Sequence, residues 1–217
     1  MNRMMDKHQL TYLLQLLSDS FNEKQDELCQ LDAELGDGDL GLTMNKAMYE
    51  ALLYIRDTEE KDLGIIASNI GLQISEVAAS TIGTLIASGF RKAGSYLKGK
   101  HEITTDELVE AFAKFNEGIQ KRGKAEIGDK TILDVLIPVQ QYMKNTEPSE
   151  WQNTPNKLVV QAEQHLTIAT QLQSQKGRAA RYLEKTIGKA DAGTKAAVYG
   201  LNALSKFLDH LNEEAES

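Results

Sequence analysis

Three aspartates lie close together in a glycine-rich segment near residue 35. The run reads Gly36-Asp37-Gly38-Asp39-Leu40-Gly41, and Asp32 lies shortly before it. Glycine lets the backbone turn sharply, so the carboxylates of Asp37 and Asp39 can converge with that of Asp32. Three neighbouring carboxylates repel one another unless a cation compensates their charge. The pattern therefore predicts a site for a hard divalent cation, Mg²⁺ or Ca²⁺.

Two other patterns match this run only in part. G-x-G-x-x-G binds dinucleotides after a β-strand, whereas the residues before Gly36 have helical periodicity. An EF-hand loop starting at Asp32 would need Gly and Glu where this chain has Asp37 and Thr43. A purely structural role remains an alternative to metal binding, because Asp and Gly are common in helix caps and turns.

A second run, Gly128-Asp129-Lys130-Thr131 after Gly123, is similar to a Walker A loop. Asp129 separates the glycine from the lysine, and no strand precedes the run, so we exclude a P-loop. The four histidines lie outside both runs, and no Ser-His-Asp or Cys-His arrangement can be proposed. The sequence therefore gives little support to covalent catalysis.

Helices must position these residues, because apolar side chains recur along most of the chain in steps of three or four. A stripe from Leu10 to Leu31 predicts a long first helix, and Thr104 with Glu107 forms a capping box that begins another. Similar periodicity covers residues 42–55, 63–74, 78–97, 131–143, 158–173 and 197–211. No segment has the period of two typical of strands. We expect an all-α bundle of about eight helices.

Length and composition fit one globular domain over residues 1–217. The polar segment 145–156, with Pro148, Trp151 and Pro155, is expected to be a loop between helices. Lys and Arg total 24 against 32 Asp and Glu, and this net charge of −8 disfavours nucleic acid as a partner. Cys29 is the only cysteine, so we expect no disulfide but a buried thiol. With no signal-like or membrane-spanning apolar run, we expect a cytoplasmic protein without membrane contact.

Three blocks stand out in order along the chain: 31–41, 121–131, and Gly177-Arg178-Ala179 through to Asp191-Ala192-Gly193. Their order and spacing resemble the nucleotide-binding L subunits of bacterial dihydroxyacetone kinases over nearly the whole chain. The resemblance implies a barrel of eight antiparallel helices. It also implies that loops at one end of the barrel hold a nucleotide.

The resemblance further implies a site and its cofactors. Asp32, Asp37 and Asp39 would hold two Mg²⁺ ions that bridge the phosphates of ADP or ATP. Arg178 would be the catalytic cation, because a guanidinium stays charged and offers several donors. The residues around the nucleotide would be Leu40, Gly41, Leu42, Thr43, Ser80, Thr81, Ile82, Gly83, Gly123, Ile132, Arg178, Asp191, Ala192 and Gly193.

The implied activity is that of a kinase of glycerol metabolism, a transferase that phosphorylates dihydroxyacetone (glycerone). This chain would present the phosphoryl donor, and a separate K subunit would hold the short ketose. Two donors stay open: free ATP, or a phosphohistidine M subunit of a phosphotransferase system that rephosphorylates bound ADP. Another short ketose such as erythrulose, and a homodimer, also stay open.

The chain departs from the family pattern in three places. His-Gly-x-Asn is replaced by Leu40-Gly41-Leu42-Thr43, Gly-Gly-Ala-Ser-Gly by 79–83, and Gly-His-x-Asp-Pro-Gly by 188–193. Two polar contacts are thereby lost, while the hydroxyls of Ser80 and Thr81 can partly replace backbone contacts to phosphate. The alternative function is therefore a non-catalytic, nucleotide-binding regulatory paralogue that kept the three carboxylates.

Overall fold

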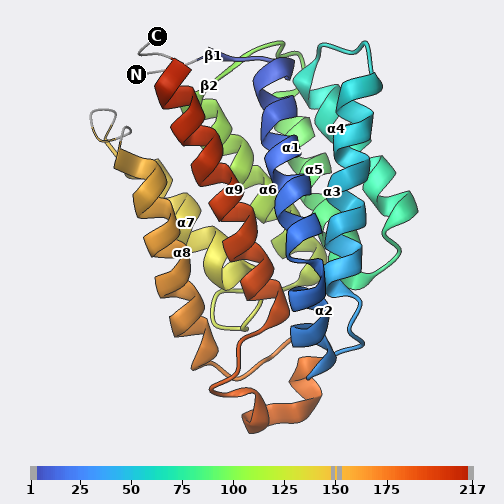
Figure 1. Cartoon of the computed structure of the whole chain (residues 1–217), viewed down its shortest axis with the longest axis vertical. Coiled ribbons are helices and arrows are strands. Elements are labelled where there is room, and N and C mark those ends of the chain that lie inside the picture. The colour runs from blue at the N-terminus through green and yellow to red at the C-terminus, as the bar shows by residue number, and fades with distance from the viewer. Residues whose placement is uncertain (1–3, 148–149, 151–152, 215–217) are drawn as a thin grey trace.

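The predicted apolar stripes form long helices that pack side by side in the computed structural model (Figure 1). The structure describes residues 4–147, 150 and 153–214. Its helices are α1 (Lys7–Glu23), α2 (Gln25–Ala33), α3 (Leu40–Asp57), α4 (Leu63–Val77), α5 (Thr81–Leu97), α6 (Thr105–Gly123), α7 (Leu133–Lys144), α8 (Thr154–Thr170) and α9 (Ala192–Glu214). The all-α prediction is confirmed. So is the capping box, in which Thr104 and Glu107 bond each other's backbone N–H at the start of α6.

The helices form a closed ring. Starting from α1, the ring runs through α3, α4, α5, α6, α7, α8 and α9, each packed against the next, and α9 packs back against α1. Apolar side chains from around the ring fill the interior, among them Leu28, Ile55, Ile66, Leu133 and Phe207, all at most 2% exposed. The arrangement is a helical barrel with a packed core. None of the helices in the described residues is long and apolar enough to cross a membrane.

Alternating helix direction decides which loops meet. Successive helices of the ring run antiparallel, so α3, α5, α7 and α9 all begin at the same end of the barrel (Figure 1). The end of α2 lies there too. We call this end the site end. Met4 and Glu214 lie at the opposite end, where β1 (Met4–Met5) pairs antiparallel with β2 (Ile103–Thr104). This small sheet was not predicted, because two-residue strands are too short to show a period.

The predicted first helix from Leu10 to Leu31 is in fact two helices, and that prediction was wrong. Lys24 separates α1 from α2 with non-helical dihedral angles (φ −96°, ψ 6°). Its N–H still donates to Ser20 O at 3.1 Å, so the chain bends without losing its apolar stripe. Counting α1 and α2 together gives the eight helices of the ring.

Other boundaries also differ from the predictions. Pro155 lies in the first turn of α8, where its missing N–H costs nothing, so the loop predicted over 145–156 ends earlier. Pro148 and Trp151 lie outside the described residues. α8 ends at Thr170 rather than near residue 173. The segment 171–191 between α8 and α9, called the strap below, contains the 3₁₀ helix η2 (Ala179–Thr186). Cys29 is only half-buried.

Candidate functional site

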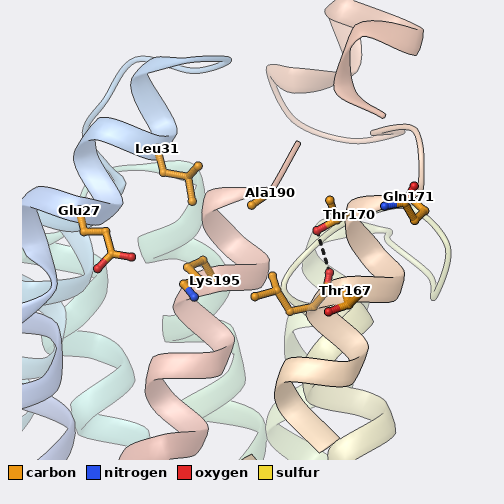
Figure 2. Close-up of a pocket in the computed structure, with 8 residues that line it drawn as sticks. Glu27, Leu31, Thr167, Thr170, Gln171, Ala190 and Lys195 are labelled. Atoms are coloured by element: carbon orange, nitrogen blue, oxygen red, sulfur yellow. Dashed lines mark hydrogen bonds between the residues drawn. The ribbon is translucent and has the colours of Figure 1, made fainter. Parts of the chain in front are cut away.

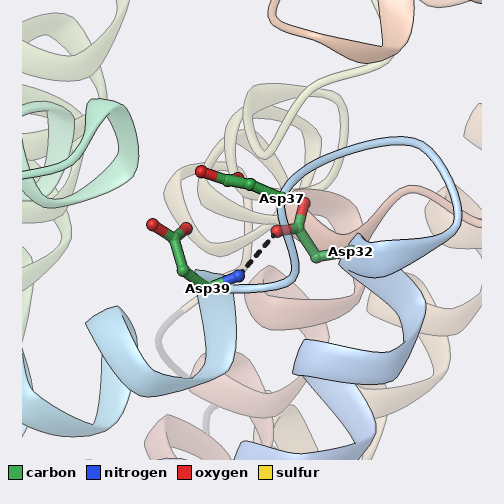
Figure 3. A group of neighbouring side chains, drawn as sticks. All are labelled: Asp32, Asp37 and Asp39. Carbon is green, nitrogen blue, oxygen red and sulfur yellow. Dashed lines mark hydrogen bonds between the residues drawn. The ribbon is translucent and has the colours of Figure 1, made fainter.

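Three carboxylates gather where α2 leads into α3 (Figure 3). Asp32 lies in the last turn of α2, Asp37 in the loop, and Asp39 at the N-cap of α3. Each offers one oxygen, and these oxygens all lie within 4.8 Å of one another. Since Mg²⁺ takes oxygen ligands at about 2.0–2.1 Å, small side-chain movements would bring these oxygens to a shared cation. The donor set, all hard oxygens, fits Mg²⁺.

Asp32 also holds the loop in shape. Its Oδ2 accepts hydrogen bonds from the N–H groups of Gly38 and Asp39 at 2.9 and 3.1 Å. Gly38 has φ +75°, which favours glycine, and a side chain at Gly36 would lie 2.4 Å from Asp32 Oδ1. Both glycines are therefore needed for the carboxylates to converge. The two N–H groups also offset part of the charge that the carboxylates bring together.

Arg178 brings a cation to this site from the strap. Its guanidinium forms an ion pair with the Asp37 carboxylate. Both side chains are about half exposed, so the pair lies at the surface of the barrel end. The strap therefore crosses the carboxylate triad (Asp32, Asp37, Asp39) and places a permanent positive charge beside it, where anionic ligands would be attracted.

The other predicted residues come to the same end. Ser80 to Gly83 form the start of α5, and Gly123 ends α6. Ile132 lies at the start of α7, and Gly193 lies at the start of α9. A side chain at Gly193 would lie 3.6 Å from the Ile132 nitrogen, so α7 and α9 begin side by side. A side chain at Gly123 would lie 3.1 Å from Leu85 in the first turns of α5. Every predicted segment thus borders the site end.

The side chains of these segments differ in where they lie. Leu40 packs against the apolar core, Thr43 is buried, and Leu42 is 56% exposed. Ser80 Oγ accepts the Gly83 N–H at 3.1 Å and so caps α5. The first turns of α3 and α5 thus begin at the site end, where the N–H groups of helix N-termini can attract an anion.

Asp191 lies just before α9 and beside the triad. Its Oδ1 accepts the Thr194 N–H at 2.9 Å. Burial raises the pKa of Asp191 to about 6, and the nearby Asp32 charge adds to this effect. Hydrogen bonds from the Thr194 and Gly193 N–H groups, together with the Lys130 charge, oppose the rise in pKa. Asp191 is therefore a carboxyl group whose charge responds to its neighbours near neutral pH.

A hollow of about 380 Å³ lies beside the site, between α2, α8 and α9 (Figure 2). Lys195 and Glu27 face it, and the Tyr199 ring lies between them: Lys195 Nζ is 5.3 Å from the ring centroid, and the Tyr199 hydroxyl donates to Glu27. Both ends of the strap border the hollow, at Gln171 and Ala190. The wall of the hollow thus includes both ends of the strap and Leu31, the residue before Asp32.

Comparison with protein families gives the fold a name. Residues 34–206 match the model of the DAK2 domain. The chain belongs to the DAK2 domain family. The matched range includes every predicted site residue except Asp32, which lies two residues before it.

Relatives of this DAK2 domain include three bacterial kinase subunits. The ADP-binding subunit DhaL of the PEP-dependent dihydroxyacetone kinase of Escherichia coli is 28% identical, over 93% of this chain and 97% of that protein. A Listeria innocua subunit of the same description is 29% identical over 94% and 96%. The PTS-dependent counterpart from Lactococcus lactis is 30% identical over 82% and 88%. The similarity thus covers at least 82% of this chain and at least 88% of each relative.

Solved structures share the fold of the DAK2 domain. The dihydroxyacetone kinase of C. freundii superposes with a TM-score of 0.70 over 91% of this chain, at 24% identity. The same kinase in complex with AMP-PNP and Mg²⁺ gives 0.69 over 90%, at 23% identity. This chain spans about a third of that kinase's length. The likeness extends to the whole barrel.

Two residues that support the site were not predicted. Lys130 and Asp134 hold the loop between α6 and α7 and the strap, through hydrogen bonds to main-chain atoms. The run Gly128 to Thr131 belongs to the second block of the family resemblance and is similar to a Walker A loop, but neither pattern assigns a role to Lys130 or Asp134. No sequence pattern indicates a lysine that binds carbonyl groups 40 to 56 residues away.

Proposed function

We propose that this DAK2 domain is the nucleotide-binding subunit of a dihydroxyacetone kinase. It binds ADP or ATP with two Mg²⁺ ions at the site end and presents the phosphoryl group to a short ketose held by a separate K subunit. The observation that carries the proposal is the carboxylate triad beside Arg178. Alignment with an ADP-binding subunit over 93% of the chain supports it.

The residues divide the work of phosphoryl transfer. Asp32, Asp37 and Asp39 would hold the Mg²⁺ ions, which when bound neutralise phosphate oxygens. Arg178 supplies a further positive charge that stabilises the phosphoryl group in the transition state. Main-chain groups of Leu40 to Thr43, Ser80 to Gly83, Gly123, Ile132 and Asp191 to Gly193 surround the nucleotide. Catalysis then rests on positioning and charge neutralisation.

We propose that the protein works in the cytoplasm. We further propose that the phosphoryl donor is a phosphohistidine M subunit, with ADP kept as a coenzyme. The relatives that match over nearly their whole length are named as PEP- or PTS-dependent subunits. An L-erythrulose kinase of Pectobacterium atrosepticum is 26% identical, but the match covers only 32% of it. Dihydroxyacetone is therefore the proposed acceptor.

A reconstituted assay tests this function. The chain is mixed with its cognate K subunit and dihydroxyacetone, and with either phosphorylated M subunit or Mg·ATP, and dihydroxyacetone phosphate is measured. We expect turnover on the order of 1 to 100 per second with the M subunit, and much slower turnover with ATP. Equal rates would indicate free exchange of ATP. Faster turnover of erythrulose would change the acceptor.

The second candidate is the regulatory paralogue, which the replacement of the family's His and Asn by Leu40 and Thr43 favours. It predicts Mg²⁺-dependent binding of ADP by calorimetry without phosphoryl transfer from either donor. That result, obtained with a K subunit shown to be active with another L subunit, would overturn the kinase proposal.

A further inference from the structure

Lys130 is a buried lysine whose ammonium lies under the strap. The residue is 2% exposed. Its Nζ donates to three main-chain carbonyls, those of Thr170 at 3.2 Å, Leu172 at 3.0 Å and Thr186 at 2.5 Å. A lysine ammonium has three N–H donors, so these bonds use all of them. An ammonium saturated in this way has no donor left for a phosphate.

The three carbonyls lie on either side of the exposed part of the strap, one of them in the last residue of α8. Thr170 and Leu172 lie where the chain leaves α8, and Thr186 lies where it returns at the end of η2. The Gly188 N–H donates to Thr170 O at 2.9 Å, and the Ser174 N–H donates to Thr186 Oγ1 at 2.9 Å. These bonds join the two sides of the strap at one narrow place, called the neck below, which consists of Thr170, Leu172, Ser174, Thr186 and Gly188. Ser174 and Thr186 are buried, whereas most of the residues between them are exposed.

Arg178 lies on the exposed part of the strap beyond this neck. It lies four positions after Ser174 and eight positions before Thr186. Its guanidinium reaches Asp37 across the site end. With so little of the surrounding strap buried, the location of Arg178 depends on how firmly the neck is closed, because exposed loops held at few points open easily.

The loop that carries Lys130 is itself firmly held. Asp134, 5% exposed, accepts the N–H groups of Gly128 and Thr131, both at 2.6 Å. The Gln175 N–H donates to Asp129 O at 3.0 Å, which joins strap and loop directly. Lys130 has φ +59°, a conformation uncommon outside glycine. The bonds that Asp134 accepts and the bond from Gln175 to Asp129 hold the backbone on both sides of Lys130 in this conformation.

We propose that Lys130 is a positioning residue whose ammonium closes the neck of the strap and thereby holds Arg178 beside the carboxylate triad. Its effect on turnover rests on the proposed function, whereas its effect on the strap does not. A buried ammonium and its carbonyl partners depend on each other, because neither side can turn to water. Lys130 thus acts through Arg178 and not on the phosphate.

Limited proteolysis tests the effect on the strap. Chymotrypsin cuts after Tyr182, which is 45% exposed and lies within η2. We expect Lys130→Met to be cut there about tenfold faster than the wild type, because loss of the neck bonds raises the open population. Lys185→Met, which removes an exposed lysine from the same strap, is the matched control and should be cut at the wild-type rate. Circular dichroism checks that both variants fold.

Kinetics test the effect on Arg178. We expect Lys130→Met to lower kcat about 100-fold, as loss of one transition-state donor does, while its Kd for Mg·ADP changes less than about threefold. In an Arg178→Ala background, Lys130→Met should lower kcat no further, because both changes remove the same interaction. Multiplying effects would show that Lys130 acts on its own and would overturn the proposal.

A second variant covers the case in which Lys130→Met does not fold. Thr186→Val keeps the shape of the side chain but removes the Oγ1 that accepts from Ser174, so it should also speed cleavage after Tyr182. Cleavage at the wild-type rate in every folded neck variant would overturn the positioning role. A wild-type chain that transfers no phosphoryl group would contradict the proposed function alone, since the cleavage result stands without it.

Discussion

Asp32 and Asp39 both belong to the triad, but the loop depends on them differently. Asp32 Oδ2 accepts hydrogen bonds from two main-chain N–H groups, so its carboxylate shapes the turn in addition to its proposed role as a metal ligand. The Asp39 side chain makes no capping bond to α3. Replacing Asp39 therefore removes a proposed metal ligand with little effect on the fold, which makes it the cleaner probe of the site.

We expect Asp39→Asn to weaken Mg²⁺-dependent ADP binding by at least about 10- to 100-fold. Its Tm should stay the same or rise slightly, because one of three mutually repelling charges is gone. Calorimetry with and without Mg²⁺ measures the binding. Asp57→Asn, exposed at the other end of α3, is the control and should bind as the wild type does. Equal binding by both variants would contradict the metal assignment.

Leu40 is one of the residues at which this chain departs from the family pattern, and reversing the departure should carry a cost in stability. Its side chain packs against the core. Leu40→His should therefore lower the free energy of unfolding by roughly 1 kcal/mol through lost apolar burial. Binding of Mg·ADP should be equal or tighter, since an imidazole adds a polar contact worth about 1 kcal/mol. Denaturant unfolding and calorimetry measure the two effects. Weaker binding with unchanged stability would contradict this account.

At the scale of elements, α2 and α3 meet at a crossing too tight for a side chain. A Cβ at Gly41 would lie 2.0 Å from Gln25 O and 2.9 Å from Cys29 Sγ. Gly41→Ala should force the helices apart and lower the free energy of unfolding by about 1–3 kcal/mol. In α9, a Cβ at Gly200 would meet nothing nearer than 3.9 Å. Gly200→Ala, the control, should be neutral or stabilise by up to about 1 kcal/mol. Urea denaturation of the two variants measures the difference. Equal free energies of unfolding would contradict the close contact of α2 and α3 at Gly41.

The start of α9 should make stability depend on pH. Because burial raises the pKa of Asp191 to about 6, the unfolded chain releases this proton first as pH rises. The stability linked to this group is therefore lost between about pH 4 and pH 6. Asp191→Asn keeps an acceptor for the Thr194 N–H and removes the titration.

We expect Asp191→Asn to gain stability relative to the wild type by up to about 3 kcal/mol between pH 4 and pH 7. Unfolding curves at the two pH values in Mg²⁺-free buffer measure the gain. The control Asp57→Asn, at an exposed position, should show the same dependence of the free energy of unfolding on pH as the wild type. If Asp191→Asn also shows the same pH dependence of the free energy of unfolding as the wild type, then burial does not raise the pKa of Asp191.

Periodicity predicted the helices well, because each buries one continuous stripe along the barrel. It could not predict the break at Lys24, since Phe21 and Leu28 stay in phase across the bend. The triad was predictable because its residues are neighbours in sequence. The neck of the strap was not, because Lys130 binds carbonyl oxygens, which every residue has and no side-chain pattern reveals.

The whole molecule should respond to its ligand in its melting temperature. A ligand that binds only the folded chain adds about 2.7 kcal/mol at a concentration of 100 Kd. For a domain of this size that corresponds to a rise in Tm of roughly 5–10 °C. Mg²⁺ and ADP together should produce this rise in Tm. Mg²⁺ alone, ADP alone, or ADP in the presence of EDTA should raise the Tm much less. An equal rise with Asp39→Asn would show that binding does not use the triad.

The closed ring has a consequence for how the chain is made. Nearly all its interfaces join helices that follow closely in sequence, but the seam between α1 and α9 joins distant ones, with Ser20 Oγ donating to Tyr199 O across 179 residues. On the ribosome, α1 waits for its partner until the last helix emerges. A nascent barrel is therefore an open arc with its apolar lining uncovered, and the seam completes it last. Substitutions in the seam accordingly change the rate of opening more than the rate of folding.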